Sequence, residues 1–146
     1  MIDTFRPADD QLPPLLVELI FVLSDDLKGV VGDILAELEL TDALADALWQ
    51  LDPAGPPPSM RQLAAGLRCD PSTVTFLADR LMERGLIDVR VDPADRRRKM
   101  VTLTPKGADI RQRLLATLTN RTSMTRLSPE EQRQLYNLLS RAVTAT

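Results

Sequence analysis

The densest positive charge in the sequence is a run of four consecutive cations, Arg96, Arg97, Arg98 and Lys99. The run ends a charged segment, 92–99, between two short segments rich in β-branched residues, 86–91 and 100–103. Such a pattern predicts a β-hairpin whose tip carries the cations. A protruding cationic tip can contact DNA phosphates, and arginine is favoured in a narrow minor groove. We predict that Arg97 enters the minor groove and that Arg98 and Lys99 lie near phosphates; the alternative is a solvated loop.

A second candidate contact surface precedes the hairpin. Asp70 followed by Pro71 is typical of an N-cap and first helical position, and Gly85 is typical of the residue just past a helix end. Apolar residues at three- and four-residue spacing predict one buried stripe on a helix over 71–84, made of Val74, Leu77, Ala78, Leu81 and Met82. The residues that then face outward are Ser72, Thr73, Thr75, Phe76, Asp79, Arg80 and Glu83.

These outward side chains suit contact with duplex DNA. Small hydroxyl groups can approach the floor of the major groove, and a helix N-terminus favours phosphate. For Ser72 and Thr73 the alternative is helix capping. Arg80 either contacts a phosphate or pairs with Glu83 or Asp79. Phe76 either presses on thymine methyl groups or packs on a neighbouring side chain.

Composition excludes several other kinds of chemistry. The chain has no histidine, which removes the usual general base and the commonest metal ligand. The single Cys69 cannot form an internal disulfide, is more typical of a small buried residue than of a redox sensor, and favours a reducing cytoplasm. No glycine-rich phosphate loop is present, and the most apolar run, 12–23, is too short for a membrane span. We predict neither an enzyme nor a metal or cofactor site.

The other elements are mostly helical. After a polar start that we expect to fray (1–11), helices are predicted over 13–37, from an N-cap at Thr41, over 59–67, over 105–120 and after a capping box at Ser128. The segment 52–58, with three successive prolines, excludes a helix and predicts a stiff connector. The predicted class is therefore mostly α with a small β-hairpin.

The order of two short helices (59–67 and 71–84) and a basic hairpin is that of a winged helix-turn-helix, which places its second helix in the major groove. Charge is divided accordingly. Residues 1–58 carry 12 acids and 2 bases, a net charge of −10, whereas residues 59–146 carry 9 acids and 16 bases, a net charge of +7. This asymmetry is more informative than the total of −3.

Five fragments, in order, resemble the MarR (multiple-antibiotic-resistance regulator) family of bacterial transcriptional regulators. They are DPSTVT (70–75), DRLMERGLI (79–87), DPADRR (92–97), LTPKG (103–107) and LSPEE (127–131). The resemblance covers about residues 38–145 and implies that the whole chain, 1–146, is one MarR-type domain. It further implies a winged DNA-binding lobe over 38–104 and a helical dimerisation lobe made of 12–37 and 105–145.

The resemblance also implies how such a protein works. A homodimer would bind a pseudo-palindromic operator, more as a repressor than as an activator, and a small aromatic or anionic effector bound between the lobes could release it. Phe21 and Trp49 are candidates to line that pocket, although a plain core role is the stronger alternative. Arg96 is expected to pair with Asp92 or Asp95 and so shape the wing, as its counterpart does in relatives.

The chain departs from the family pattern at three places. Phe76 stands where arginine is frequent, the triple proline replaces a short strand that normally joins the hairpin, and residues 1–58 are unusually acidic. A winged-helix module that binds protein instead of DNA is the alternative function. The four cations at the hairpin tip argue against it, because protein binding has no need of them.

Overall fold

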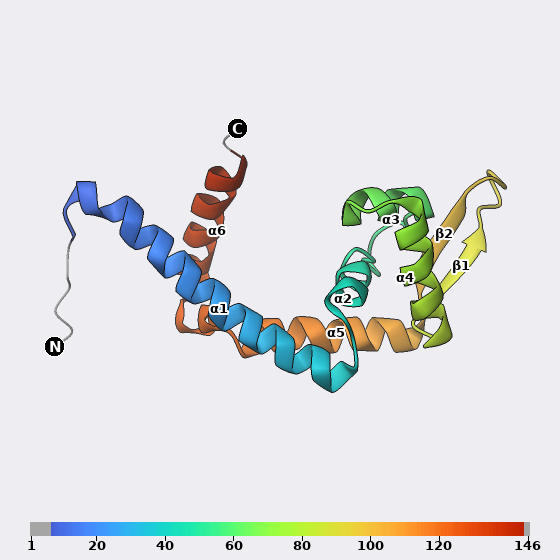
Figure 1. The fold of residues 1–146 in the computed structure, drawn as a ribbon, viewed down its shortest axis with the longest axis horizontal. Coiled ribbons are helices and arrows are strands. Elements are labelled where there is room, and N and C mark those ends of the chain that lie inside the picture. Colours follow the sequence, from blue (N-terminus) through green and yellow to red (C-terminus); the bar gives the residue numbers. More distant parts are fainter. Residues whose placement is uncertain (1–6, 145–146) are drawn as a thin grey trace. The chain divides into compact units, whose positions relative to one another are not determined.

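The computed structural model describes residues 7–144 of the chain, so residues 1–6 of the polar start and residue 145 of the predicted dimerisation lobe lie outside the described residues. Figure 1 shows the order of elements: η1 (Asp9–Gln11), α1 (Leu12–Leu38), α2 (Asp42–Trp49), α3 (Met60–Leu67), α4 (Pro71–Glu83), β1 (Ile87–Val91), β2 (Lys99–Leu103), α5 (Pro105–Asn120), η2 (Ser123–Arg126) and α6 (Pro129–Thr144). The predicted class, mostly helical with one hairpin, is confirmed.

The chain divides into two compact units. We call Asp33–Ala116 the winged unit, and we call the residues up to Gly32 together with those from Thr117 onward the helical unit. The winged unit holds the end of α1, the helices α2 to α4, the hairpin and most of α5. Its core is aliphatic, and its largest fully buried side chains are Leu48, Leu63, Leu81, Leu86, Ile87 and Val101.

Local capping sets where the helices of the winged unit begin. The Thr41 hydroxyl accepts the N–H of Leu44 at 3.2 Å, as the predicted N-cap of α2 requires. Ser59 caps α3 through a reciprocal capping box: its hydroxyl accepts the Gln62 N–H, and the Gln62 side chain accepts the Ser59 N–H. These bonds satisfy donors that the first helical turn leaves without intrahelical partners.

The hairpin pairs β1 with β2 in antiparallel register, with Val89 opposite Val101. The triple-proline connector reaches the other edge of β2 at one point only, where the Val101 N–H donates to the Pro58 carbonyl at 2.9 Å. An isolated bridge between Ser59 and Met100 is all that remains of a third strand. Because proline offers a carbonyl but no N–H, the connector can accept hydrogen bonds from β2 and cannot return them.

Thr104 joins the base of the hairpin to α4 and α5. Its N–H donates to the Leu86 carbonyl at 3.1 Å, and its hydroxyl donates to the Gly85 carbonyl at 2.6 Å. The same hydroxyl accepts the Gly107 N–H at 3.0 Å and so caps α5. Gly85 itself has a positive φ of 68°, which ends α4 as the sequence predicts.

Arg84 ties the end of α4 to the end of α1. Its guanidinium donates to the carbonyls of Glu39, at 2.6 Å, and Leu38, at 2.9 Å. Glu39 adopts a left-handed conformation with φ of 54°, so it ends α1 without a glycine. Charge-assisted bonds from an arginine to the last carbonyls of a helix also complement the helix dipole.

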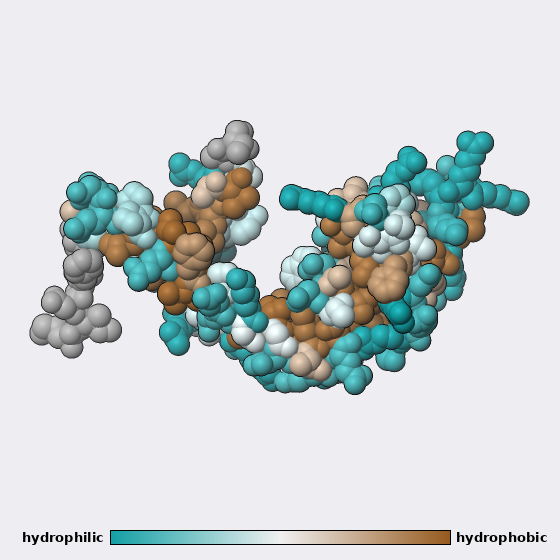
Figure 2. Space-filling model, in the orientation of Figure 1, coloured by the Kyte–Doolittle hydropathy of each residue, from teal (hydrophilic) through white to brown (hydrophobic). Residues whose placement is uncertain are grey.

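In the helical unit, α6 begins at the predicted capping box. The Ser128 N–H donates to the Glu131 carboxylate at 2.8 Å, and the Glu131 N–H donates to the Ser128 hydroxyl at 3.2 Å. Both long helices of this unit leave large apolar side chains exposed, including Leu19, Ile20 and Val22 on α1 and Leu138 and Val143 on α6. Figure 2 shows apolar residues exposed at the surface of α1 and α6.

The structure corrects one local prediction. Met82 is not part of the buried stripe of α4: it is 38% exposed, whereas Val74, Leu77, Ala78 and Leu81 are buried. The next buried residue after Leu81 is Leu86, which follows the helix end. The turn between α3 and α4 is made by Arg68 in a left-handed conformation, with φ of 54°, while Gly66 lies inside α3.

We expect Gly107→Ala to lower the free energy of unfolding by about 2–3 kcal/mol, because a Cβ there would overlap the Leu86 carbonyl. Gly55→Ala is the matched control, since its Cβ would make ordinary contacts at 3.7 Å or more and should change stability by less than about 0.5 kcal/mol. Urea denaturation of both variants measures the difference. Equal stability of the two would contradict the close approach of α5 to Leu86.

Candidate nucleic-acid interface

The exposed face of α4 begins at a well-formed N-cap. The Asp70 carboxylate accepts the Thr73 N–H at 2.7 Å and the Ser72 hydroxyl at 2.8 Å. Together with Pro71 at the first helical position, these bonds fix the start of α4 as predicted. Val74 and Leu77 are buried, which turns the opposite face of the helix to solvent.

The hydrogen bonds at this N-cap also act on the Asp70 carboxyl group. The Thr73 backbone N–H, with smaller contributions from the Thr73 and Ser72 side chains, lowers the pKa of Asp70 below its usual value. Asp70 therefore stays charged to lower pH than a free aspartate. Its negative charge complements the N-terminal end of the helix dipole.

The hydroxyl residues predicted to contact DNA, Ser72, Thr73 and Thr75, are all exposed. Their local bonds restrict how they can do so. The Ser72 hydroxyl donates a hydrogen bond to the Asp70 carboxylate, and the Thr75 hydroxyl donates one to the Pro71 carbonyl at 2.8 Å. In this arrangement the two hydroxyls can accept hydrogen bonds from base amino groups, and to donate to a phosphate they must first rotate. Ser72 and Thr73 thus take part in the N-cap through their bonds to Asp70, and both residues remain exposed at the surface.

Phe76, Arg80 and Glu83 form one cluster along the exposed side of α4. The Arg80 guanidinium lies over the Phe76 ring, 5.1 Å from its centre, and pairs with the Glu83 carboxylate at 3.4 Å. Phe76 nevertheless remains 56% exposed. An exposed pair such as Arg80–Glu83 is weak, so Arg80 can exchange Glu83 for a phosphate at little cost.

The loop between β1 and β2, which with the two strands we call the wing, is shaped by two aspartates. The Asp92 carboxylate accepts the Ala94 N–H at 2.9 Å, and the Asp95 carboxylate accepts the Arg97 N–H at 3.0 Å. Within residues 7–144, Arg96 makes no ion pair with either aspartate, so the expectation that Arg96 shapes the wing is wrong. The carboxylates hold the turn through backbone N–H groups instead.

The four cations of the wing all lie at the surface, with Arg96 to Arg98 in the loop and Lys99 at the start of β2. None of them forms an ion pair among the described residues. Arg97, Arg98 and Lys99 line a hollow of about 750 Å³ between the wing and the first turn of α3. Arg61 lines the same hollow.

The sequence reasoning missed Arg61. It lies in the first turn of α3, two residues after the Ser59 N-cap, where its side chain is exposed and faces the same hollow as the wing cations. A basic residue near the start of the first helix of a helix-turn-helix is the signal that could have found it. Its proximity to the wing, nearly 40 residues later in the chain, depends on the tertiary fold.

The two residues proposed to line an effector pocket lie in different units. Phe21 is on α1 in the helical unit and is 66% exposed. Trp49 ends α2 in the winged unit, is 46% exposed, and lies under the Arg111 guanidinium, 5.6 Å from the ring centre. Arg111 also donates to the carbonyls of Leu48 and Trp49, so it closes the C-terminal end of α2.

Other kinds of site find little support in the part of the chain that the structure describes. Residues 7–144 contain no cluster of three or more cysteine, aspartate or glutamate side chains able to hold a metal ion. Over the same residues, no helix combines the length and the apolar character needed to cross a bilayer. Cys69 is a free, half-buried thiol in the turn before α4.

An exposed capped helix beside a basic hairpin, on a helical scaffold, defines a winged helix-turn-helix protein. Residues 40–99 match the sequence model of the MarR family. The family consists of DNA-binding transcriptional regulators. No curated protein matches the chain.

Solved structures share the fold along most of the chain. YusO from Bacillus subtilis has a TM-score of 0.72 at 24% identity, covering 96% of this chain and 100% of that one. A MarR-family transcriptional regulator from a Rhodococcus species has a TM-score of 0.68 at 24% identity, with coverage of 92% and 96%. A Staphylococcus aureus MepR mutant bound to an oligodeoxyribonucleotide has a TM-score of 0.65 at 24% identity, with coverage of 89% and 96%.

The lowered pKa of Asp70 predicts a specific acid response. Because the folded pKa lies below the unfolded value of about 3.9, the charged cap stabilises the fold above that value and loses its effect as pH falls through the folded pKa. We expect the Asp70 carboxyl carbon to titrate below pH 3.9 by NMR. Asp70→Asn keeps an acceptor oxygen but no charge. As the pH falls from 5 through the folded pKa of Asp70, its free energy of unfolding should therefore decrease less than that of the parent protein. An unshifted midpoint would contradict the cap geometry.

Proposed function

We propose that this chain is a bacterial transcriptional regulator that acts in the cytoplasm as a homodimer and binds a pseudo-palindromic operator in duplex DNA. The observation that carries the proposal is the pairing of a solvent-exposed α4 with a wing whose four cations have no acidic partner among the described residues. Unpaired cations on a protruding hairpin are available to phosphates without first breaking an ion pair.

In this proposal each element makes a different kind of contact. The N-terminal half of α4 enters the major groove, where Ser72, Thr73 and Thr75 face bases or phosphates and Phe76 contacts thymine methyl groups. Arg97 reaches into the minor groove, where arginine is favoured. The remaining cations, Arg61, Arg80, Arg96, Arg98 and Lys99, lie along the phosphates and set affinity more than sequence preference.

The homodimer is proposed from the apolar surface of the helical unit. Leu16, Leu19 and Ile20 on α1, together with Leu138 and Leu139 on α6, are each about half exposed. So many large apolar side chains on two helices exceed what a monomer ordinarily leaves in water. We therefore assign 12–37 and 105–145 to a dimerisation lobe and 38–104 to the DNA-binding lobe of one MarR-type domain.

We further propose that the regulator acts as a repressor and that a small aromatic or anionic effector can release it from DNA. Trp49 under Arg111 supports this part, because an exposed indole beside a guanidinium suits an aromatic anion. Phe21 is the proposed contact from the helical unit.

A protein-binding winged helix is the competing function. The hollow shared by Arg61, Arg97, Arg98 and Lys99 favours DNA. Any duplex supplies phosphates for these cations, whereas a protein partner would need acidic side chains at matching positions. The salt dependence of DNA binding separates the two functions.

Sedimentation equilibrium at micromolar concentration should give twice the chain mass of 16.2 kDa. Leu139→Glu places a charge in the proposed interface and should shift the protein toward monomer. Gln134→Glu adds the same charge on the same helix at an exposed polar position, and this control should remain dimeric. A stable monomer in the parent protein would remove the dimer from the proposal.

The logarithm of DNA affinity should fall with the logarithm of salt concentration with a slope of about −4 to −7, as expected if each subunit contacts two to four phosphates. Arg61→Ala and Arg97→Ala should each reduce the magnitude of this slope by up to about 2, because a dimer loses two contacts. Arg113→Ala, which removes an exposed cation of α5 outside the hollow, is the matched control and should leave the slope unchanged.

Fluorescence anisotropy with a selected operator measures all four proteins. A flat salt response of the parent would exclude DNA binding and leave the protein-binding function. A normal parental slope that Arg61→Ala and Arg97→Ala do not change would instead reject the assignment of the hollow to phosphate.

A further inference from the structure

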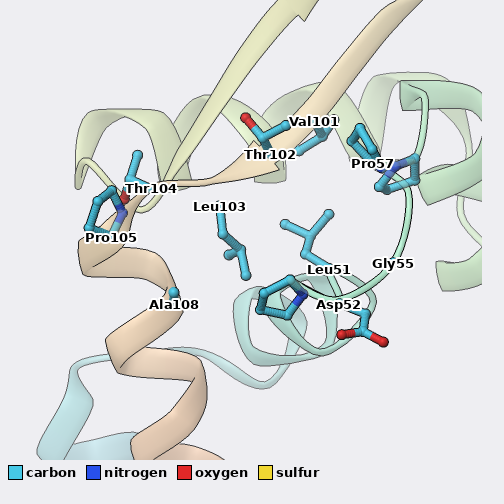
Figure 3. A pocket seen from close by; sticks show the side chains of 12 residues that line it. Leu51, Asp52, Gly55, Pro57, Val101, Thr102, Leu103, Thr104, Pro105 and Ala108 are labelled. Carbon is cyan, nitrogen blue, oxygen red and sulfur yellow. The ribbon is translucent and has the colours of Figure 1, made fainter.

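A second cavity of the winged unit, of about 420 Å³, lies beneath the edge of β2 that faces away from β1. Its walls come from the end of α2, the proline connector, β2 and the first turns of α5. Figure 3 shows Leu51 and Leu103 facing the space between these elements, with Ala108 of α5 on another side. Neither Phe21 nor Trp49 lines it. Its volume lies in the range of small-molecule sites.

The edge of β2 next to this cavity is only partly hydrogen-bonded. In an antiparallel pair, alternate residues direct their N–H and C=O groups away from the partner strand. Val101 does so, because its N–H donates to Pro58, and Leu103 two residues later must point the same way. The connector has three successive prolines opposite this edge and supplies no N–H to the outward carbonyls of Val101 and Leu103.

The cavity is therefore rich in acceptors and poor in donors. Four of its lining residues are prolines, which contribute carbonyl groups without N–H groups: Pro53, Pro57, Pro58 and Pro105. The Thr104 hydroxyl is already used on Gly85 and Gly107. Two main donors are then left: the backbone N–H of Leu103 and the side-chain hydroxyl of Thr102.

The charge around the cavity also favours a ligand with donor groups over an anion. Asp52 is the only ionisable side chain that lines the cavity, and Figure 3 places it at the rim on the connector side. Its Oδ1 atom accepts the Ala54 N–H at 2.9 Å. No lysine or arginine lines the cavity, so an anion would find neither a counter-ion nor a set of donors there.

We propose that this cavity binds a small apolar molecule that carries a cationic N–H donor group, such as an aromatic amidine. The apolar body packs against Leu51, Leu103 and Ala108, and the donor group faces Asp52 and the free carbonyls of β2. Ligand binding here is independent of DNA binding and of the proposed site around Phe21 and Trp49, and it selects the opposite charge to the anionic effector expected there.

Three probes of nearly the same shape and different charge test the proposal: benzamidine (cation), benzamide (neutral) and benzoate (anion). Each is titrated into the full-length protein, and the amide signals of Leu51, Gly55, Leu103 and Ala108 are followed by NMR. We expect millimolar binding, with benzamidine about twofold to fivefold tighter than benzamide because of the exposed acid, and with no shift of these signals by benzoate.

Two variants locate the site. Asp52→Asn keeps the acceptor for the Ala54 N–H and should abolish the preference for benzamidine over benzamide. Ala108→Leu fills the cavity and should weaken both ligands by about tenfold or more, whereas Ala116→Leu, an exposed change on the same helix, should not. If Ala108→Leu unfolds the protein, Asp52→Asn still tests whether the acid at the rim selects the cation.

The proposal is overturned if benzoate binds as well as benzamidine, if no probe shifts these signals up to about 10 mM, or if Asp52→Asn leaves the preference intact. Equal binding by a folded Ala108→Leu and by Ala116→Leu would also overturn it. Because no DNA is present, these results stand apart from the salt-dependence test of the proposed function.

Discussion

The carbonyl group of Leu86 is the point at which the end of α4, the base of the wing and the start of α5 are joined. Leu86 follows the glycine that ends α4, its side chain is fully buried, and its carbonyl accepts the N–H of Thr104 at the base of the wing. Helix α5 approaches the same carbonyl so closely that only glycine fits at position 107. The direction in which α4 ends and the direction in which the hairpin leaves are thus set together. A wing that contacts one groove and a helix that contacts the next need this fixed relation, because a loosely joined pair would lose entropy on binding.

The charge distribution reconciles an acidic protein with an anionic partner. The net charge of −3 would repel DNA at long range if it were spread evenly. Instead the acids concentrate in the first 58 residues, while Arg61, Arg97, Arg98 and Lys99 lie around one hollow. Over a Debye length of about 8 Å at physiological salt, the charges nearest the phosphates dominate. The net charge of the chain therefore indicates little about DNA binding, whereas the cations around the hollow indicate much more.

How far the sequence predicts this structure depends on how local each signal is. The N-caps at Thr41, Ser59 and Asp70 and the capping box at Ser128 were all predictable, because each is decided by residues three positions apart. The hydrogen bonds from Arg84 to the end of α1 and the position of Arg61 beside the wing were missed, since both join segments distant in sequence. The ion pair of Arg96 with Asp92 or Asp95 was expected from the family resemblance, but both carboxylates accept backbone N–H groups of the turn instead. Met82 keeps the helical spacing of the stripe, but α4 ends within two residues and its side chain stays exposed.

The chemistry of the wing tip has a physiological consequence. Arginine and lysine keep their charge far above neutral pH, and the chain contains no histidine whose proton could come and go between pH 5 and 8. The charge of the α4 N-cap is also insensitive to pH near neutrality, because Asp70 stays ionised to lower pH than usual. A change of pH between 5 and 8 would then leave the positive charge of the wing and the negative charge of Asp70 nearly constant. In the proposed regulator, DNA binding would therefore depend little on pH in this range and could be controlled by other chemical signals.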